Sequence, residues 1–196
     1  MPSNNLNYTK ACVIVHGKTE LLFTRYICTN LHLKIKPIAK DKGKTSIQIN
    51  GLLKFMNGQN FKSLKAFAEF YSIEYDPKNK SLKDFKLFII MDTDDCDEKT
   101  KEDYITGRLF KNHILSDYIV PIYNIENFED VMIKANISTK KIPSGDKGKY
   151  YSKIFPINTS PLSMDTIKEV KTFMNKIKDV TETNMNEFID YCLSLL

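Results

Sequence analysis

Three aspartates follow a strongly apolar segment of the sequence, and their spacing suits metal binding. Asp92, Asp94 and Asp95 come directly after the run 87–91. Such a run indicates a strand buried on both faces, in the middle of a parallel sheet covered by helices. In an extended strand Asp92 and Asp94 share a face, and two close carboxylates repel unless a cation lies between them. Oxygen ligands of this kind suit Mg²⁺ or Mn²⁺, whereas the alternative is a solvated acidic turn that caps a helix.

Two further groups of polar residues follow other apolar runs. His16 and Glu20 come after the run 11–15, and acidic residues also come after the run 118–123. Parallel strands end at one edge of a sheet, where open α/β sheets bind their ligands, so we expect the three groups to meet there. The candidate metal ligands are Asp92, Asp94, Asp95, Glu20, Glu126 and Glu129.

Lysines lie beside these acidic groups and could bind phosphate. Lys18 follows the first strand, and the tetrapeptide Asp-Lys-Gly-Lys occurs twice, at 41–44 and 146–149. Glycine lets the backbone approach a ligand closely, and the flanking lysines supply ammonium donors. The alternative is that these are ordinary surface loops. The candidate nucleic-acid contacts are Lys18, Lys42, Lys44, Lys147, Lys149 and Lys153.

The elements that must position these residues alternate between strand and helix. The pattern predicts an α/β fold, in which a parallel sheet of about four strands is flanked by helices and joined by right-handed crossovers. Thr19 is the expected N-cap of the first helix. For residues 57–85 we expect an irregular insertion that contains a helix. The expected strands are 11–15, 33–39, 87–91 and 118–123, and the expected helices are 20–30, 46–56, 64–71, 98–110 and 126–135.

The C-terminal third has a different pattern. Residues 138–161 are rich in Lys, Ser, Gly and Pro, which predicts a long surface connection. An amphipathic helix capped by Ser163 follows, and then a last helix over 185–195, opened by Asn184 and Glu187 in a capping-box-like arrangement. We therefore expect an α/β domain over residues 1–136, with a basic loop and a C-terminal helical extension, residues 137–196, packed on the same domain.

Composition excludes several classes of protein. The chain has 196 residues, of which 42% are hydrophobic, and a net charge of +5. No apolar stretch is long enough to span a membrane, and the N-terminus lacks the features of a signal peptide. The four cysteines are scattered without a Cys-x-x-Cys pair, which predicts a reduced, cytoplasmic protein without a thiolate zinc site. The phosphate-loop pattern is incomplete, because Cys12 stands where its first glycine would be.

Two segments together resemble the Toprim domain. They are Val-Ile-Val-His-Gly-Lys-Thr-Glu at 13–20 and Ile-Ile-Met-Asp-Thr-Asp-Asp at 89–95. The family pattern is an apolar strand that ends in Glu-Gly, followed later by an apolar strand that ends in Asp-x-Asp. The resemblance covers roughly residues 10–136. The Gly-Lys-Thr-Glu turn and the later Ile-Glu-Asn-Phe-Glu at 125–129 are similar to the small defence-associated branch, which includes overcoming-lysogenization-defect-like and abortive-infection proteins.

This resemblance implies a function and roles for individual residues. It implies Mg²⁺- or Mn²⁺-dependent hydrolysis of phosphodiesters in DNA or RNA, in bacterial defence against phage, with a partner ATPase. Asp92 and Asp94 would hold the metal, and Asp95 would assist or cap the next helix. Glu126 or Glu129 would supply a further carboxylate.

The first motif departs from the family, since His16 stands where the family has glutamate. Three alternatives follow. His16 takes over proton transfer, or Glu20 reaches the metal from the next helix, or the site is weakened and the chain is a module that binds nucleic acid, a nucleotide or a protein. On the first two alternatives the catalytic residues are His16, Glu20, Asp92 and Asp94. A primase-like nucleotidyl transferase is a further candidate, although the chain is short and has no zinc-binding segment.

Overall fold

A parallel sheet of four strands forms the centre of the computed structural model, which describes residues 8–143 and 145–196. The strands lie in the order β2-β1-β5-β6, and every neighbouring pair is parallel. The predicted α/β class is confirmed, and the architecture is Rossmann-like. The strands are β1 (Ala11–Val15), β2 (Ile35–Ile38), β5 (Lys86–Asp92) and β6 (Ile119–Asn124).

The two central strands are buried on both faces. All five residues of β1 are 0% exposed, and their side chains alternate between two hydrophobic cores. Ala11 and Val13 belong to one core, whereas Cys12 and Ile14 belong to the other. Because successive side chains of a strand point to opposite faces, a strand between two helical layers must be apolar at every position. This is why the sequence shows a continuous apolar run here.

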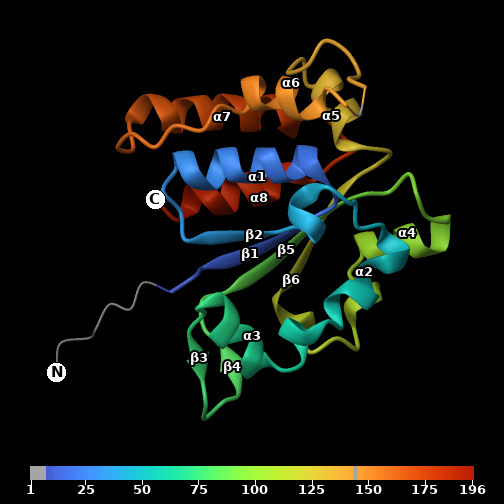
Figure 1. Cartoon of the computed structure of the whole chain (residues 1–196), viewed down its shortest axis with the longest axis vertical. Helices are drawn as coiled ribbons and strands as arrows, with labels where there is room; N and C mark the ends of the chain where they lie inside the picture. The colour runs from blue at the N-terminus through green and yellow to red at the C-terminus, as the bar shows by residue number, and fades with distance from the viewer. Residues whose placement is uncertain (1–7, 144) are drawn as a thin grey trace.

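Helices cover both faces of the sheet (Figure 1). On one face α1 and α8 lie next to the strands, and α7 lies outside them, with α5 and α6 at the end where α1 begins. On the opposite face lie α2, α3 and α4. The bounds are α1 (Lys18–Asn30), α2 (Ile49–Met56), α3 (Leu64–Tyr71), α4 (Glu98–Ile105), α5 (Phe128–Lys134), α6 (Lys147–Ile154), α7 (Met164–Lys178) and α8 (Met185–Ser194).

Short elements complete the described chain. The antiparallel hairpin of β3 (Tyr75–Asp76) and β4 (Ser81–Leu82) packs with α3 at the end of the molecule away from the start of α1 (Figure 1). It lies in the predicted irregular insertion. The 3₁₀ turns are η1 (Lys40–Gly43), η2 (Gln59–Phe61), η3 (Arg108–Phe110) and η4 (Ser116–Tyr118).

Several local predictions were wrong. Gly17, not Thr19, is the N-cap of α1, and the Thr19 hydroxyl instead points to Glu129. Helix α4 ends at Ile105 because Gly107 adopts a left-handed conformation with φ 74°. The segment predicted as a surface connection contains α6. Asn184 precedes α8 as expected, but its side chain forms no cap hydrogen bond.

The order of the strands places a topological switch between β1 and β5. The chain leaves β1 toward β2 on one side, and later returns to β5 on the other side of β1. Loops that leave two adjacent strands in opposite directions open a crevice at the carboxyl ends of those strands. His16 follows β1, and Asp92 ends β5, so the fold brings both to this crevice. None of the helices in the described ranges has the length and apolar character that crossing a membrane requires.

Candidate functional site

A cavity of about 610 Å³ lies at the carboxyl ends of β1 and β5. It brings together residues from six segments of the chain: the turn after β1 with the start of α1, η1 with the residues after it, the end of β5, the start of α5, the connection between α5 and α6, and the start of α6. Nine of the residues predicted from the sequence line it: His16, Lys18, Glu20, Lys42, Lys44, Asp92, Asp94, Glu129 and Lys147.

Asp92 is held in one orientation at the end of β5. Its side chain is only 7% exposed. Asn124 Nδ2 and the backbone N–H of Phe128 both donate to Asp92 Oδ1, each at 3.0 Å. Among the described residues the hydrogen bonds reach Oδ1 alone, which leaves Oδ2 available to a ligand in the cavity.

Glu20 approaches the same cavity from the first turn of α1. It is 3% exposed, and the backbone N–H of Gly17 donates to its Oε2 at 2.9 Å. A Cβ atom on Gly17 would lie 3.4 Å from that oxygen and 3.2 Å from Ser46 Oγ, so glycine lets the backbone come this close. The N-terminus of a helix favours a negative charge, which helps to keep a carboxylate here.

Burial and mutual repulsion act on the two carboxylates. Burial raises the pKa of Asp92 well above its ordinary value, and the charge of Glu20 raises it further. Burial also raises the pKa of Glu20, whereas the nearby His16 lowers it. Two buried carboxylates that repel each other are stabilised by a proton or by a cation between them. The pair therefore has the electrostatic properties of a cation site.

His16, which lines the cavity, interacts electrostatically with Asp95. In the described part of the chain, His16 Nδ1 and both carboxylate oxygens of Asp95 are buried without a hydrogen-bond partner. Burial raises the pKa of Asp95, and His16 lowers it, so the two side chains are close enough to interact. Asp95, unlike Asp92 and Asp94, does not line the cavity itself.

The remaining acidic candidates differ in their placement. Asp94 is exposed and lines the cavity. Glu129 also lines it, but Glu129 Oε1 lies 2.6 Å from Lys147 Nζ, so this carboxylate already has a cationic partner. Glu126 is exposed and lies outside the cavity, because its backbone turns with φ 71° and its carbonyl accepts a hydrogen bond from Thr93 N. The structure does not bring Glu126 to the other carboxylates.

Both Asp-Lys-Gly-Lys segments contribute to the cavity wall. In the first, Asp41, Lys42 and Gly43 all have positive φ (47°, 58° and 83°), and a Cβ on Gly43 would lie 2.9 Å from Leu21 Cδ2. Backbone strain of this kind is concentrated at functional sites. From the second, only Lys147 reaches the cavity.

Lys149 and Lys153 line a separate cavity of about 290 Å³ together with Tyr150. Lys141, which the sequence did not single out, borders both this cavity and the larger one.

Asn124 and Thr183 are also part of the site, although neither was predicted. Asn124 is 0% exposed at the end of β6, and Thr183 Oγ1 donates to its Oδ1 at 2.9 Å. The bonds Thr183 to Asn124 and Asn124 to Asp92 thus form a chain that orients the carboxylate. Asn124 could have been found from the sequence, because it is a polar residue at the end of an apolar strand. Thr183 could not, because it lies 59 positions away from Asn124 and nothing in the local sequence indicates their contact.

We expect Asn124→Asp to weaken binding of Mn²⁺ about 10- to 100-fold, the usual effect of losing a residue that orients a metal ligand. The change keeps the size of the side chain, removes the N–H donor to Asp92 and adds a repelling charge. Isothermal titration calorimetry with MnCl₂ measures it. Asn184→Asp is the matched control, since Asn184 bonds Tyr123 N and Pro121 O on the same strand. Equal affinities for Mn²⁺ in the wild type and Asn124→Asp would contradict this role.

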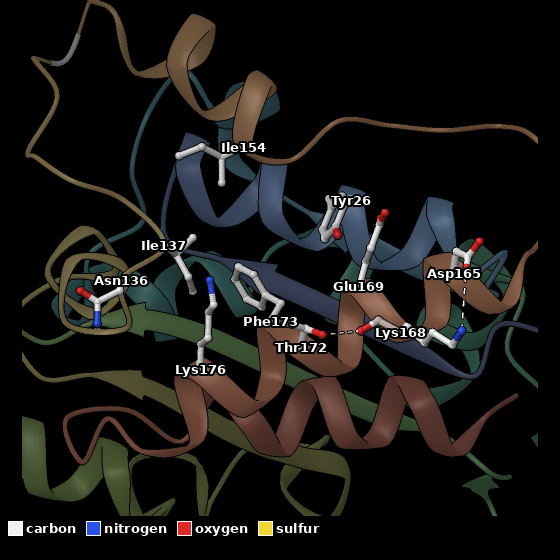
Figure 2. Close-up of a pocket in the computed structure, with 10 residues that line it drawn as sticks. All are labelled: Tyr26, Asn136, Ile137, Ile154, Asp165, Lys168, Glu169, Thr172, Phe173 and Lys176. Carbon is white, nitrogen blue, oxygen red and sulfur yellow. Dashed lines mark hydrogen bonds and ion pairs between the residues drawn. The ribbon is translucent and has the colours of Figure 1, made fainter.

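A second cavity, of about 460 Å³, lies between α1, α6 and α7 (Figure 2). Its lining mixes apolar side chains such as Ile137 and Phe173 with charged ones of α7. Two of these charged residues, Asp165 and Lys168, pair with each other at 3.5 Å. None of the site residues predicted from the sequence lines this second cavity. We therefore take the larger cavity as the candidate functional site.

Glu20 and Asp92 are the residues of the larger cavity that could hold a hard divalent cation. Within residues 8–143 and 145–196, no three His, Cys, Asp or Glu side chains gather closely enough to hold a metal ion by themselves. Mg²⁺ is commonly bound by one or two carboxylates, with water and substrate phosphates completing its coordination. Glu20 and Asp92 supply such a pair, and the adjacent lysines would attract the phosphates.

Comparison with known proteins finds no matching family model, no similar curated protein and no similar solved structure. The resemblance to the Toprim domain therefore stays a prediction from two motifs, and function must be argued from the geometry of the cavity.

Proposed function

We propose that this chain is a divalent-metal-dependent nuclease that hydrolyses phosphodiester bonds in DNA or RNA. The observation that carries the proposal is one cavity in which buried Glu20 and Asp92 lie together with five lysines: Lys18, Lys42, Lys44, Lys141 and Lys147. Carboxylates alone would repel a phosphodiester, and lysines alone would only bind it. A cation between the carboxylates, with lysines around it, both attracts the phosphate and activates it.

Each group has a role in this scheme. Glu20 and Asp92 would hold Mg²⁺ or Mn²⁺, with Asp94 at the exposed side. Such an ion, when bound, polarises the phosphate and lowers the pKa of water. The lysines neutralise and position the phosphates. His16 is half-buried and close enough to Glu20 to affect its pKa, and its imidazole would move a proton to or from the reacting groups.

A second function is favoured by two observations. The first motif has His16 in place of glutamate, and Glu129 is already paired with Lys147. Both reduce the number of carboxylates free to hold a metal. A module that binds nucleic acid, a nucleotide or a protein partner without hydrolysis would need only the lysines, and its binding would persist in EDTA.

Incubation of the purified chain with end-labelled single-stranded DNA, duplex DNA and single-stranded RNA tests the proposal. We expect cleavage of at least one of them in Mg²⁺ or Mn²⁺ and none in EDTA. Absence of cleavage with every substrate in both metals would refute the nuclease, and retention of the labelled strand under the same conditions would favour the binding module. A role in antiviral defence together with a partner ATPase is proposed from the resemblance to the Toprim domain alone. Co-purification of the chain with an ATPase would test it.

A further inference from the structure

The carboxylates of the candidate site lie deeper than its lysines. Glu20 and Asp92 are buried, whereas Lys42, Lys44 and Lys141 line the same cavity and are exposed. A phosphate that reaches the buried pair must therefore pass the lysines first. A phosphate at the deep end would lose its hydration and be repelled by the carboxylates, so it could lie there only beside the cation that the pair is proposed to hold.

The start of α6 closes one side of this cavity. A Cβ on Gly148 would lie only 2.6 Å from Lys18 Nζ, so the Lys18 side chain already passes directly over the backbone of α6. The pair of Lys147 Nζ and Glu129 Oε1, 2.6 Å apart, joins α6 to α5. Lys141 is tied to Asp130 of α5 at 2.8 Å. A polynucleotide cannot run through the cavity on this side without breaking these contacts.

The size of the cavity also limits what enters. A volume of about 610 Å³ is in the range of pockets that enclose small ligands, roughly 300–1,000 Å³. A duplex is a wide, convex rod, and enzymes that bring a nucleotide into an enclosed pocket must unstack it or act on a single strand. A recessed pair of carboxylates in a cavity closed on one side is reached most directly by a chain that ends inside it.

We propose that the substrate of this site is the free end of a single-stranded nucleic acid, which enters end-first and loses one nucleotide at a time. This inference rests on the proposed nuclease function. Water adds to the phosphorus of the terminal phosphodiester, the bond from phosphorus to the leaving sugar oxygen breaks, and that oxygen takes up the proton. The products are a mononucleotide and a strand shorter by one.

A linear oligonucleotide and the same sequence ligated into a circle test this inference. Both are single-stranded DNA with an internal label, and a parallel pair is made of RNA. With the wild-type chain in Mn²⁺ we expect the linear form to disappear at least about tenfold faster, a difference of ~1.4 kcal/mol in barrier. We also expect labelled strands that shorten by single nucleotides before labelled mononucleotide appears, and slower loss of a blunt duplex of the same sequence.

The outcomes separate the inference from the function on which it rests. Opening of the circle at the rate of the linear strand overturns the end-first mode while leaving the nuclease intact. Early labelled fragments of scattered lengths, without a continuous ladder of single-nucleotide losses, overturn it as well. Loss of neither linear nor circular form refutes the nuclease and the inference together. Asp92→Asn, run in parallel, must lack both activities, which excludes a contaminating nuclease as their source.

Discussion

Asp92→Asn will lower metal-dependent cleavage by about 10³-fold, because a metal-stabilised transition state gains several kcal/mol and this change removes a charged ligand. Asparagine keeps the shape of the side chain, and its carbonyl can still accept hydrogen bonds from Asn124 and Phe128. The loss is therefore electrostatic rather than a failure to fold. Initial rates on labelled single strands in Mn²⁺ measure it, and circular dichroism confirms that the variant is folded.

Asp97→Asn is the matched control for that experiment. Asp97 belongs to the same acidic run, but it is exposed and its side chain caps α4 by accepting from Thr100 N at 2.9 Å. Asparagine caps helices about as well as aspartate, so both folding and cleavage should stay near wild type. If Asp92→Asn kept more than about a tenth of the wild-type rate, a loss of only ~1.4 kcal/mol, Asp92 would not be a metal ligand.

Mn²⁺ will raise the melting temperature of the wild-type chain at neutral pH. An ion at 100 times its dissociation constant stabilises the fold by about 2.7 kcal/mol. For a chain of this size that corresponds to roughly 5–10 °C. Differential scanning calorimetry in MnCl₂ and in EDTA measures the shift. It should vanish in Asp92→Asn, and its presence there would show that the ion binds elsewhere.

The same two carboxylates set how stability depends on pH without metal. The pKa values of Asp92 and Glu20 are raised in the folded chain, so the fold binds protons more tightly than the unfolded chain does. Their contribution to stability is fully present below the unfolded pKa values, near 4, and is lost as pH rises through the folded values. In EDTA the part of the unfolding free energy that these two carboxylates contribute should therefore fall from about pH 4 toward neutrality.

Two variants test that pH dependence. Asp92→Asn and Glu20→Gln each remove one of the groups whose pKa is raised, so each should flatten the curve and be more stable than the wild type at neutral pH in EDTA. Urea titrations at several pH values give the unfolding free energies. A pH dependence of both variants that equals that of the wild type in EDTA would contradict the raised pKa values.

The central strands and their polar ends could be predicted because burial of a strand requires apolar residues at consecutive positions of the sequence. A strand covered on both faces, such as β1 or β5, is apolar at every position, and its first polar residue marks the carboxyl edge of the sheet. His16 and Asp92 were found in this way. Their common location in one cavity follows from parallel pairing of adjacent strands.

Other parts depend on contacts that local sequence does not record. Helix α6 lies in a segment of Lys, Gly, Tyr and Ser that looks like a loop, and its order comes from packing of the fully buried Tyr151 against the core that α1 shares. The N-cap at Gly17 was missed because the capping contact comes from the Glu20 side chain and not from a hydroxyl at the cap. The pairing of Glu129 with Lys147 likewise depends on the position of α6.

The hydrogen bond from Thr183 to Asn124 has a consequence for synthesis of the protein. Strand β6 is synthesised well before residues 182–184. These three residues nevertheless form hydrogen bonds with the end of β6, at Tyr123, Asn124 and Ile125. A growing chain on the ribosome therefore lacks the hydrogen bonds that orient Asp92 through Asn124 until residues 182–184 have emerged. If Asp92 holds a metal ion as proposed, cleavage would have to await the emergence of these three residues.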